Sequence, residues 1–152
     1  MARNRLARRG GAGGPILLLI IAVVAVCAAW KLMPVPTGTG DWHVTLADGL
    51  ADAGARDVNV VVMFTADWCG PCQFFKQHVL RDGDVAEVLG TSFTTVKIDL
   101  TERSGPNSTL AGELGVRAIP ALHMYDADGY IVSRYDGQPD AGAFLRWLDP
   151  HR

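Results

Sequence analysis

The sequence predicts an α/β domain with a central mixed β-sheet and helices on both faces, preceded by one N-terminal transmembrane helix or signal segment. Three observations support this prediction. Short apolar runs rich in β-branched residues alternate with helical patterns, which is typical of a sheet covered by helices. The first run leads directly into a Cys-x-x-Cys turn. Two later runs flank an Asp-Ala-Asp-Gly turn, which predicts an antiparallel hairpin.

The predicted elements follow one another without internal repeats, in the order β-α-β-α-β-β-α with an optional first strand and helix. They are a short strand at 42–46, helices at 46–55, 73–80 and 85–89, strands at 58–64 and 93–98, a helix ending near 115, strands at 121–125 and 130–135, and a last helix from a cap at Asp140 to Leu148. Asn107 or Ser108 is predicted to cap the helix that ends near 115. The strand at 93–98 should run parallel to that at 58–64, because a helix joins them.

The motif Cys69-Gly70-Pro71-Cys72 carries the predicted chemistry. A strand that feeds a Cys-x-x-Cys turn at the start of a helix is the thioredoxin-type redox arrangement. The first cysteine then lies over the unpaired N–H groups and the positive end of the helix dipole, which stabilise a thiolate. The second follows one helical turn later, close enough to form a small disulfide ring. We therefore predict that Cys69 is the nucleophile and that Cys72 resolves the mixed disulfide.

Other uses of the cysteine pair fit the sequence less well. A structural zinc site needs four ligands, but the only other cysteine is Cys27, far upstream in an apolar run. Covalent haem attachment needs a histidine directly after the second cysteine, and that residue is Gln73. A purely structural disulfide is disfavoured because so small a ring removes little entropy from the unfolded chain. No metal is predicted.

The residues around this motif resemble the thioredoxin superfamily. The resemblance rests on the runs Ala66–Cys72, Val96–Asp99 and Gly115–Pro120, and it covers roughly Val44 to Leu148. The Ala-Asp-Trp-Cys run, the Asp-Leu-Thr segment and the Asp-Ala-Asp-Gly turn are most similar to the C-terminal periplasmic domain of the thiol:disulfide interchange protein DsbD. The resemblance implies a thioredoxin fold, a redox-active disulfide and no cofactor.

The resemblance also implies which residues would bind a substrate: Trp68, Gly70, Pro71, Ile119 and Pro120. In this superfamily the proline matching Pro120 is cis and packs beside the cysteine pair, and the backbone before it binds the substrate chain like an extra strand. Trp68 is interpreted as a core aromatic, as a flat apolar platform that shields the sulfurs, or as both together.

The sequence departs from thioredoxins at Met63, where members of the superfamily usually carry a buried aspartate that takes the proton of the resolving thiol. Asp67 is the nearest acidic replacement in sequence, and it is expected to be exposed at the strand end. His78 is interpreted as a partly buried histidine on a helix face. His123 lies in a predicted strand, but the sequence does not assign its face.

The N-terminal residues 1–32 read as a basic region followed by a transmembrane anchor. Four arginines precede an uncharged stretch of 21 residues from Gly10 to Trp30, which as a helix would span about 31 Å against a hydrocarbon core of ~30 Å. A cleaved signal peptide is the alternative. Residues 33–41 are rich in proline and glycine and read as a linker, and 42–152 form the predicted thioredoxin-like domain.

Charge divides the chain in the same way. Residues 1–31 hold five Lys and Arg and no acid, whereas residues 32–152 hold nine Lys and Arg against sixteen Asp and Glu, a net charge of −7. A domain of that sign is not a nucleic-acid binder. The positive-inside rule leaves the arginines in the cytoplasm and exports the domain.

The sequence therefore predicts a thiol:disulfide oxidoreductase held by a single span in a bacterial inner membrane, with its domain on the periplasmic side. We expect it to reduce disulfides in protein substrates through Cys69 and Cys72, and to receive electrons from a membrane thiol donor. One alternative is a reductant dedicated to cytochrome c maturation. A second is a redox-inactive domain that uses the groove at Pro120 to hold peptides.

Overall fold

The computed structural model describes Ala22 and residues 42–152. The chain separates into two compact units, Met1–Val35 and Pro36–Arg152, and the fold below is that of the second. The predicted anchor or signal segment, Cys27 and the predicted linker at 33–41 lie outside the described residues, apart from Ala22. Among the residues that are described, no helix has the length and apolar character needed to cross a bilayer.

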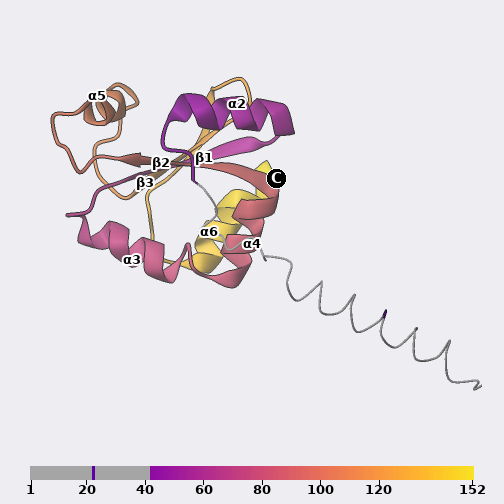
Figure 1. Ribbon diagram of the computed structural model, residues 1–152. Coiled ribbons are helices and arrows are strands. Elements are labelled where there is room, and N and C mark those ends of the chain that lie inside the picture. The colour runs from indigo at the N-terminus through magenta and orange to yellow at the C-terminus, as the bar shows by residue number, and fades with distance from the viewer. Residues whose placement is uncertain (1–21, 23–41) are drawn as a thin grey trace, which may run out of the picture. The chain divides into compact units, whose positions relative to one another are not determined.

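The domain is built on a four-stranded sheet in the order β2-β1-β3-β4 (Figure 1). The strands are β1 (Asn59–Thr65), β2 (Phe93–Asp99), β3 (Ala121–Tyr125) and β4 (Ile131–Tyr135). β1 pairs in parallel with β2 and antiparallel with β3, and β3 pairs antiparallel with β4. The predicted mixed sheet is therefore confirmed.

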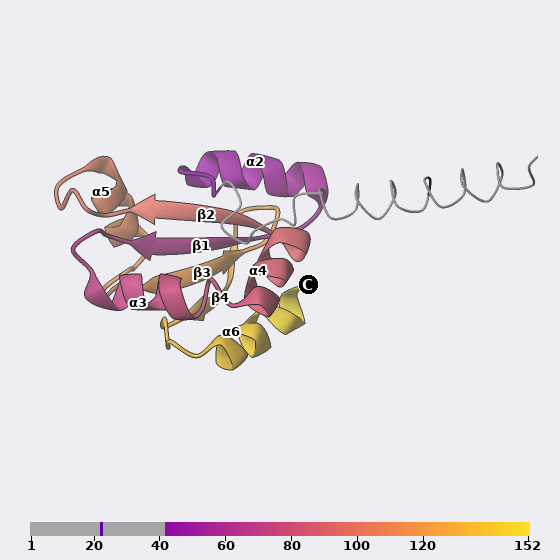
Figure 2. The ribbon, with the colours of Figure 1, turned by 60° about the horizontal axis from the view of Figure 1, so that its bottom comes forward.

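Helices cover both faces of this sheet. They are α2 (Leu46–Arg56), α3 (Gly70–His78), α4 (Gly83–Ser92), α5 (Pro106–Glu113) and α6 (Ala141–Leu148), followed by a 3₁₀ turn at Asp149–His151. Figure 1 views the sheet nearly edge-on, with α2 and α5 on one side and α3, α4 and α6 on the other. Figure 2 shows the same division from a second side, with α2 above the strands and α6 below them. This is the thioredoxin-fold arrangement that the sequence predicted.

Strand β1 forms the centre of the core. Every residue from Val60 to Thr65 is buried, as expected for a strand that helices cover on both faces. Large aromatic side chains fill the space between sheet and helices, and Phe64, Phe75 and Phe144 are all fully inaccessible to solvent. The turn after β1 and the first residues of α3 are thus held on a rigid support.

Several predicted boundaries shift by a few residues. The helix after the cysteine motif begins at Gly70, not Gln73, because Cys69 already occupies the cap position. The helix predicted at 85–89 extends over Gly83–Ser92, since Asp82 caps it through the N–H groups of Asp84 and Val85. The predicted short first strand is reduced to a single parallel bridge between His43 and Val96.

The predicted cap of α5 is wrong. Gly105 is the cap residue, without a side-chain hydrogen bond, and Pro106 occupies the first turn. Proline favours that position because its φ is already helical and its missing N–H would be unpaired there. Asn107 instead donates its side-chain N–H to the backbone carbonyl of Asp99 at 3.0 Å, and Ser108 donates its hydroxyl to the carbonyl of Glu102 at 2.6 Å.

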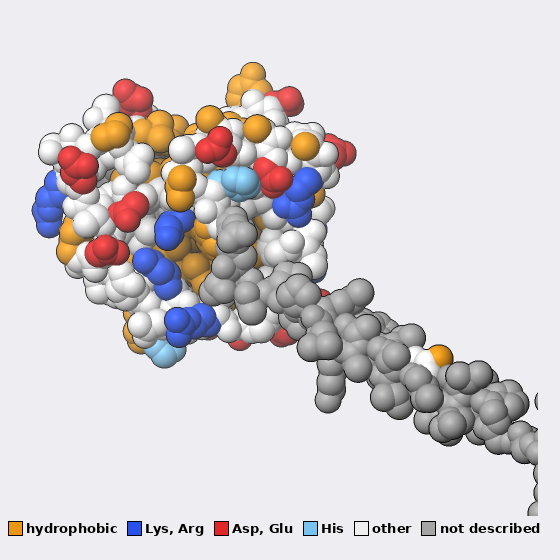
Figure 3. All heavy atoms as spheres, in the orientation of Figure 1, with side chains coloured by type: hydrophobic (Ala, Val, Ile, Leu, Met, Phe, Trp, Pro, Cys, Tyr) orange, Lys and Arg blue, Asp and Glu red, His pale blue; other side chains and the backbone are white. Residues whose placement is uncertain are grey.

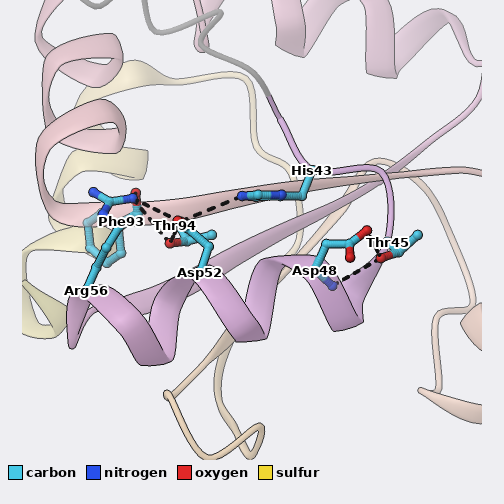
Figure 4. A network of polar contacts seen from close by, with 7 residues as sticks. All are labelled: His43, Thr45, Asp48, Asp52, Arg56, Phe93 and Thr94. Carbon is cyan, nitrogen blue, oxygen red and sulfur yellow. Dashed lines mark hydrogen bonds and ion pairs between the residues drawn. The ribbon is translucent and has the colours of Figure 1, made fainter.

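A polar cluster joins the start of the domain to α2 and β2 (Figure 4). The Asp52 carboxylate accepts a hydrogen bond from the Thr94 hydroxyl at 2.7 Å, and it lies 3.3 Å from Arg56 and 3.6 Å from His43. The Thr94 hydrogen bond is the main reason that the pKa of Asp52 falls below its usual value, although burial opposes the shift. These contacts hold the residues that enter the domain against its first helix.

Two glycines in α2 provide a test of how tightly this helix packs. A methyl group added to Gly49 would overlap the Val96 side chain, whereas one added to Gly54 would meet nothing within 4 Å. We predict that Gly49→Ala lowers the free energy of unfolding by about 1–2 kcal/mol. Gly54→Ala should raise it by roughly 0.5–1 kcal/mol, because alanine is the better helix former. Urea unfolding followed by circular dichroism measures both, and equal effects would contradict the close packing of α2 on β2.

Candidate redox site

The two motif cysteines form a disulfide at the start of α3. The Cys69–Cys72 S–S distance is 2.05 Å and the Cα–Cα distance is 5.2 Å. The chain leaves β1 at Thr65, makes a turn and reaches Cys69 in an extended conformation, which suits a helix cap. The expectation that this spacing permits a disulfide is therefore confirmed.

The N-terminus of α3 surrounds the sulfur of Cys69 with positive partial charge. This sulfur accepts a hydrogen bond from the backbone N–H of Cys72 at 3.1 Å, and the helix dipole points its positive end at the same place. Both effects favour a thiolate at Cys69 once the disulfide is reduced. Cys69 keeps 4% of its surface exposed and Cys72 keeps none, so a partner can reach only the first sulfur.

The loop before β3 lies directly beside Cys69. The Ile119–Pro120 peptide bond is cis, as the resemblance implied. The carbonyl oxygen of Ile119 lies 3.7 Å from the Cys69 sulfur. Because β3 runs antiparallel to β1, with Ala121 opposite Phe64, the start of β3 necessarily meets the end of β1. The sheet therefore brings together residues that are fifty positions apart in sequence.

Gly137 supports this loop, and the sequence analysis missed it. Its φ of +71° is in the left-handed region, and a Cβ there would lie 2.6 Å from the carbonyl oxygen of Pro120. Both the conformation and the close approach require glycine. The Asp136-Gly137 dipeptide directly after β4 signals a turn, but only the folded topology shows that this turn touches Pro120.

Trp68 lies on the surface beside the disulfide. Half of its side chain is exposed, so the core-aromatic interpretation is wrong. Its indole N–H donates to the backbone carbonyl of Thr101 at 3.1 Å, and the guanidinium of Arg103 lies 4.4 Å from the ring centroid. The hydrogen bond and the cation–π contact hold the ring in one orientation.

Thr101 and Asp99 connect the turn after β1 to the turn after β2. The Thr101 hydroxyl accepts the backbone N–H of Asp67 at 2.9 Å and donates to the Asp99 carboxylate. The Thr101 backbone N–H donates to the same carboxylate at 2.8 Å. These two hydrogen bonds, the side-chain one first, lower the pKa of Asp99 from its usual value. In the sequence, the Asp-Leu-Thr segment contributes only to the family resemblance. It does not predict this connection between the two turns.

The residues named for proton transfer fall in different surroundings. Met63 is 1% exposed and belongs to the same buried core as Cys72. Asp67 is exposed, as expected. His78 is also exposed, which corrects the prediction of a partly buried side chain. The buried side of α3 carries Cys72 and Phe75, and His78 stacks on the exposed Phe74 with ring centroids 4.0 Å apart.

His123 is a buried histidine on β3. Its ring packs edge-on against Phe64 at 5.1 Å, and burial, followed by the charge of Arg134, lowers its pKa. Its Nδ1 has no hydrogen-bond partner among the described residues. Within the described residues there is also no group of three or more His, Cys, Asp or Glu side chains suited to hold a metal ion.

An open groove of about 540 Å³ runs beside the disulfide. Trp68 and Ile119 line it next to Cys69, and α5 lines it farther away. Its apolar walls include Leu100 and Val116, and two arginines also contribute to its lining, Arg103 and Arg117. The predicted substrate residues Gly70 and Pro71 are exposed at the start of α3, and Pro120 is half-buried.

A family model described as Thioredoxin-like matches residues 41–127. The chain belongs to the thioredoxin-like family. Its fold, its disulfide-forming cysteine pair and its relatives are those of a thiol:disulfide oxidoreductase of the thioredoxin type.

One relative is the thiol:disulfide interchange protein DsbD of Tatumella citrea, which is 32% identical over 85 residues, 55% of this chain but only 14% of that protein. A thioredoxin structure from Thermus thermophilus aligns with a TM-score of 0.63 and 25% identity, covering 72% of this chain and 84% of that one. The oxidised C-terminal domain of DsbD from Neisseria meningitidis aligns with a TM-score of 0.58 and 24% identity, covering 73% of this chain and 99% of that domain. The match to the Tatumella citrea protein thus covers only a part of that protein about the size of one domain.

The connection through Thr101 predicts a measurable titration. In Thr101→Val the pKa of Asp99 should rise toward its ordinary value of 3.8, because both the side-chain hydrogen bond and the order of the turn are lost. Since the folded-state pKa is lowered, the stability that it contributes is complete above the unfolded pKa and is lost as the pH falls through the folded value. NMR titration of the Asp99 carboxyl group measures the shift. An unchanged pKa would mean that the Thr101 backbone N–H alone sets it.

Proposed function

We propose that this chain is an exported, membrane-tethered thiol:disulfide oxidoreductase that reduces disulfides in protein substrates. The observation that carries the proposal is the position of Cys69: its sulfur caps α3, retains the pair's only exposed surface and lies against the carbonyl of Ile119. An incoming strand that bonds to the backbone beside Pro120 would place its own sulfur next to Cys69.

The proposed reaction has two steps. The Cys69 thiolate attacks one sulfur of the substrate disulfide, forms a mixed disulfide and expels the other substrate sulfur as a thiolate that takes up a proton. The Cys72 thiol then loses its proton and attacks Cys69, which re-forms the Cys69–Cys72 disulfide and releases the second substrate thiol. The substrate gains two electrons and two protons, and the cysteine pair loses them.

Three features support a reducing role outside the cytoplasm. The Gly70-Pro71 dipeptide resembles that of reducing thioredoxins, DsbD is among the relatives, and the basic and apolar N-terminal sequence suits a single-span anchor. We propose that a separate membrane protein with its own cysteine pair supplies the electrons, since each turnover leaves Cys69 and Cys72 oxidised. A shared membrane would raise the effective concentration of donor and domain.

Trapping tests the proposed roles. In cells, full-length Cys72→Ser should accumulate mixed disulfides between Cys69 and exported proteins, because the resolving thiol is absent. Cys69→Ser should accumulate none, since Cys72 is fully buried. Both variants carry Cys27→Ser, so that this third thiol cannot form the adducts. Non-reducing electrophoresis followed by mass spectrometry identifies the partners.

The trapping outcomes separate the alternatives. The reverse pattern would contradict the assignment of nucleophile and resolving residue. A single apocytochrome among the trapped partners would narrow the function to cytochrome c maturation. If neither variant forms adducts and the wild-type chain does not reduce insulin disulfides, the domain is a redox-inactive peptide binder and the proposal is wrong.

The presence of Met63 predicts that the second step of the reaction, in which Cys72 resolves the mixed disulfide, is slow. Cys72 is buried in apolar surroundings, which disfavour its thiolate, and the core position that usually holds an aspartate is occupied by Met63. Met63→Asp should accelerate resolution by about ten-fold or more, because a carboxylate there can accept the proton. It should also lower stability by roughly 1–3 kcal/mol. Rapid-quench measurement of the decay of the mixed disulfide gives the rate.

The matched control is Met63→Asn. Asparagine is polar and has nearly the same shape as aspartate, but it cannot take up the proton of Cys72. It should destabilise the fold without accelerating resolution. Equal rates in the aspartate and asparagine variants, both shown to be folded, would mean that another group or water already accepts the proton.

A further inference from the structure

The groove beside the disulfide has a charge opposite to that of the domain around it. Residues 32–152 carry nine basic and sixteen acidic side chains, and Figure 3 shows acidic and basic side chains interspersed over one face. The groove, in contrast, includes Arg103 and Arg117 in its lining and no aspartate or glutamate. We infer that this groove selects protein substrates with acidic side chains next to the reactive cysteine, an inference that rests on the function proposed above.

The two arginines are available for such a contact. Both are exposed, and neither forms an ion pair with any residue that the structure describes. Both therefore retain the free N–H groups that a carboxylate accepts, in a planar arrangement that can bind both carboxylate oxygens.

Arg103 is also held in place before a substrate arrives. Its guanidinium lies 4.4 Å from the centre of the Trp68 ring, and the ring is fixed in turn by the indole hydrogen bond to the Thr101 carbonyl. A side chain that is already ordered loses less entropy on binding. The positive charge of Arg103 therefore lies over the Trp68 ring, against which the substrate chain would pack. Trp68 directly precedes Cys69 in the sequence.

Arg117 lines the same groove from the loop that leads to Pro120. It stands two residues before Ile119, whose carbonyl oxygen is 3.7 Å from the Cys69 sulfur. It also lines a second hollow of about 300 Å³, together with Pro120, Arg134, the buried His123 and a single acid, Asp136. Arg117 thus lines both hollows, and Arg134 adds another basic side chain on the Pro120 side.

The position of the two arginines determines which substrate side chains they can contact. An extended chain that pairs with the backbone at Ile119 rises about 3.3 Å per residue, so side chains within two or three residues of its cysteine reach Arg103 or Arg117. Aspartate or glutamate at those positions would meet opposite charge in a half-apolar groove, where the attraction is screened less than in open water. Lysine or arginine there would be repelled.

The test uses two synthetic peptides that differ only in charge. Each carries one cysteine joined in a disulfide to 2-mercaptoethanol, flanked by glutamates in one peptide and by glutamines in the other. Cys69 attacks the peptide sulfur and expels mercaptoethanol, and Cys72 then releases the peptide thiol. The reduced full-length chain, carrying Cys27→Ser, is mixed with each peptide, and the second-order rate constant is measured at low and high salt.

We expect the glutamate peptide to react on the order of five-fold faster at low salt, with the preference falling as salt is added. Arg103→Gln with Arg117→Gln should abolish the preference, so that this variant reacts with the two peptides at equal rates. Arg103→Lys with Arg117→Lys should retain part of it, because the charge remains. The control is Arg81→Gln, an exposed arginine outside the groove lining, which should keep the full preference.

The outcomes distinguish this inference from the proposed function. If the wild-type chain reduces both peptides at equal rates, or if the double glutamine variant keeps the preference, the groove does not select acidic substrates although the domain is a reductase. If the chain reduces neither peptide, the proposed function itself fails, and the substrate selection fails with it.

Discussion

Strand β1 is hydrogen-bonded along its length to β2 on one side and to β3 on the other, and the candidate site depends on both pairings. The parallel pairing places Asp99 opposite Thr65, so that the turns that follow the two strands meet through Thr101. The antiparallel pairing starts β3 where β1 ends, so that Ile119 reaches the Cys69 sulfur. Because β1 is buried on both faces, a slip of one residue would turn each of its packed side chains to the opposite face of the sheet, so the packing of the core fixes the register. The redox geometry is therefore a consequence of the register of the sheet.

Much of this architecture could be predicted because its signals are local. An apolar β-branched run, a Cys-Gly-Pro-Cys turn and an Asp-Ala-Asp-Gly hairpin each specify their own backbone, and the four strands predicted after residue 57 lie within a residue of the observed ones. The errors arise where tertiary contacts compete with local preference. Asn107 has the side chain of a good helix cap, but Pro106 starts the helix before it, and the side-chain N–H of Asn107 donates to the carbonyl of Asp99. His78 has the spacing of a helix-face residue, but the buried side of α3 excludes it.

The residues of the candidate site also fall into two groups, those that could be predicted from the sequence and those that could not. The cysteines could be named from their motif, because redox chemistry fixes the residue types and their spacing, and Pro120 could be named from the resemblance to the thioredoxin superfamily. Gly137 and Thr101 could not, since each acts on a partner in another segment: Gly137 on the carbonyl of Pro120, and Thr101 on the N–H of Asp67. Nor could the orientation of Arg103, which depends on a tryptophan whose own orientation depends on Thr101. Residues that position others carry no chemical signature of their own, so only the folded structure identifies them.

Burial makes the two sulfurs unequally accessible. Cys69 combines slight exposure with the N–H of Cys72 and the positive end of α3, and all three favour an accessible thiolate. Cys72 lies in the same core as Met63 with no exposed surface, which protects it from other oxidants and partners but disfavours its own ionisation. A mixed disulfide at Cys69 would then persist until Cys72 loses its proton. Under the function proposed above, that persistence would favour a slow, selective reductant, because a substrate held longer in the groove would be discriminated by its contacts with Trp68 and the arginines as well as by its sulfur chemistry.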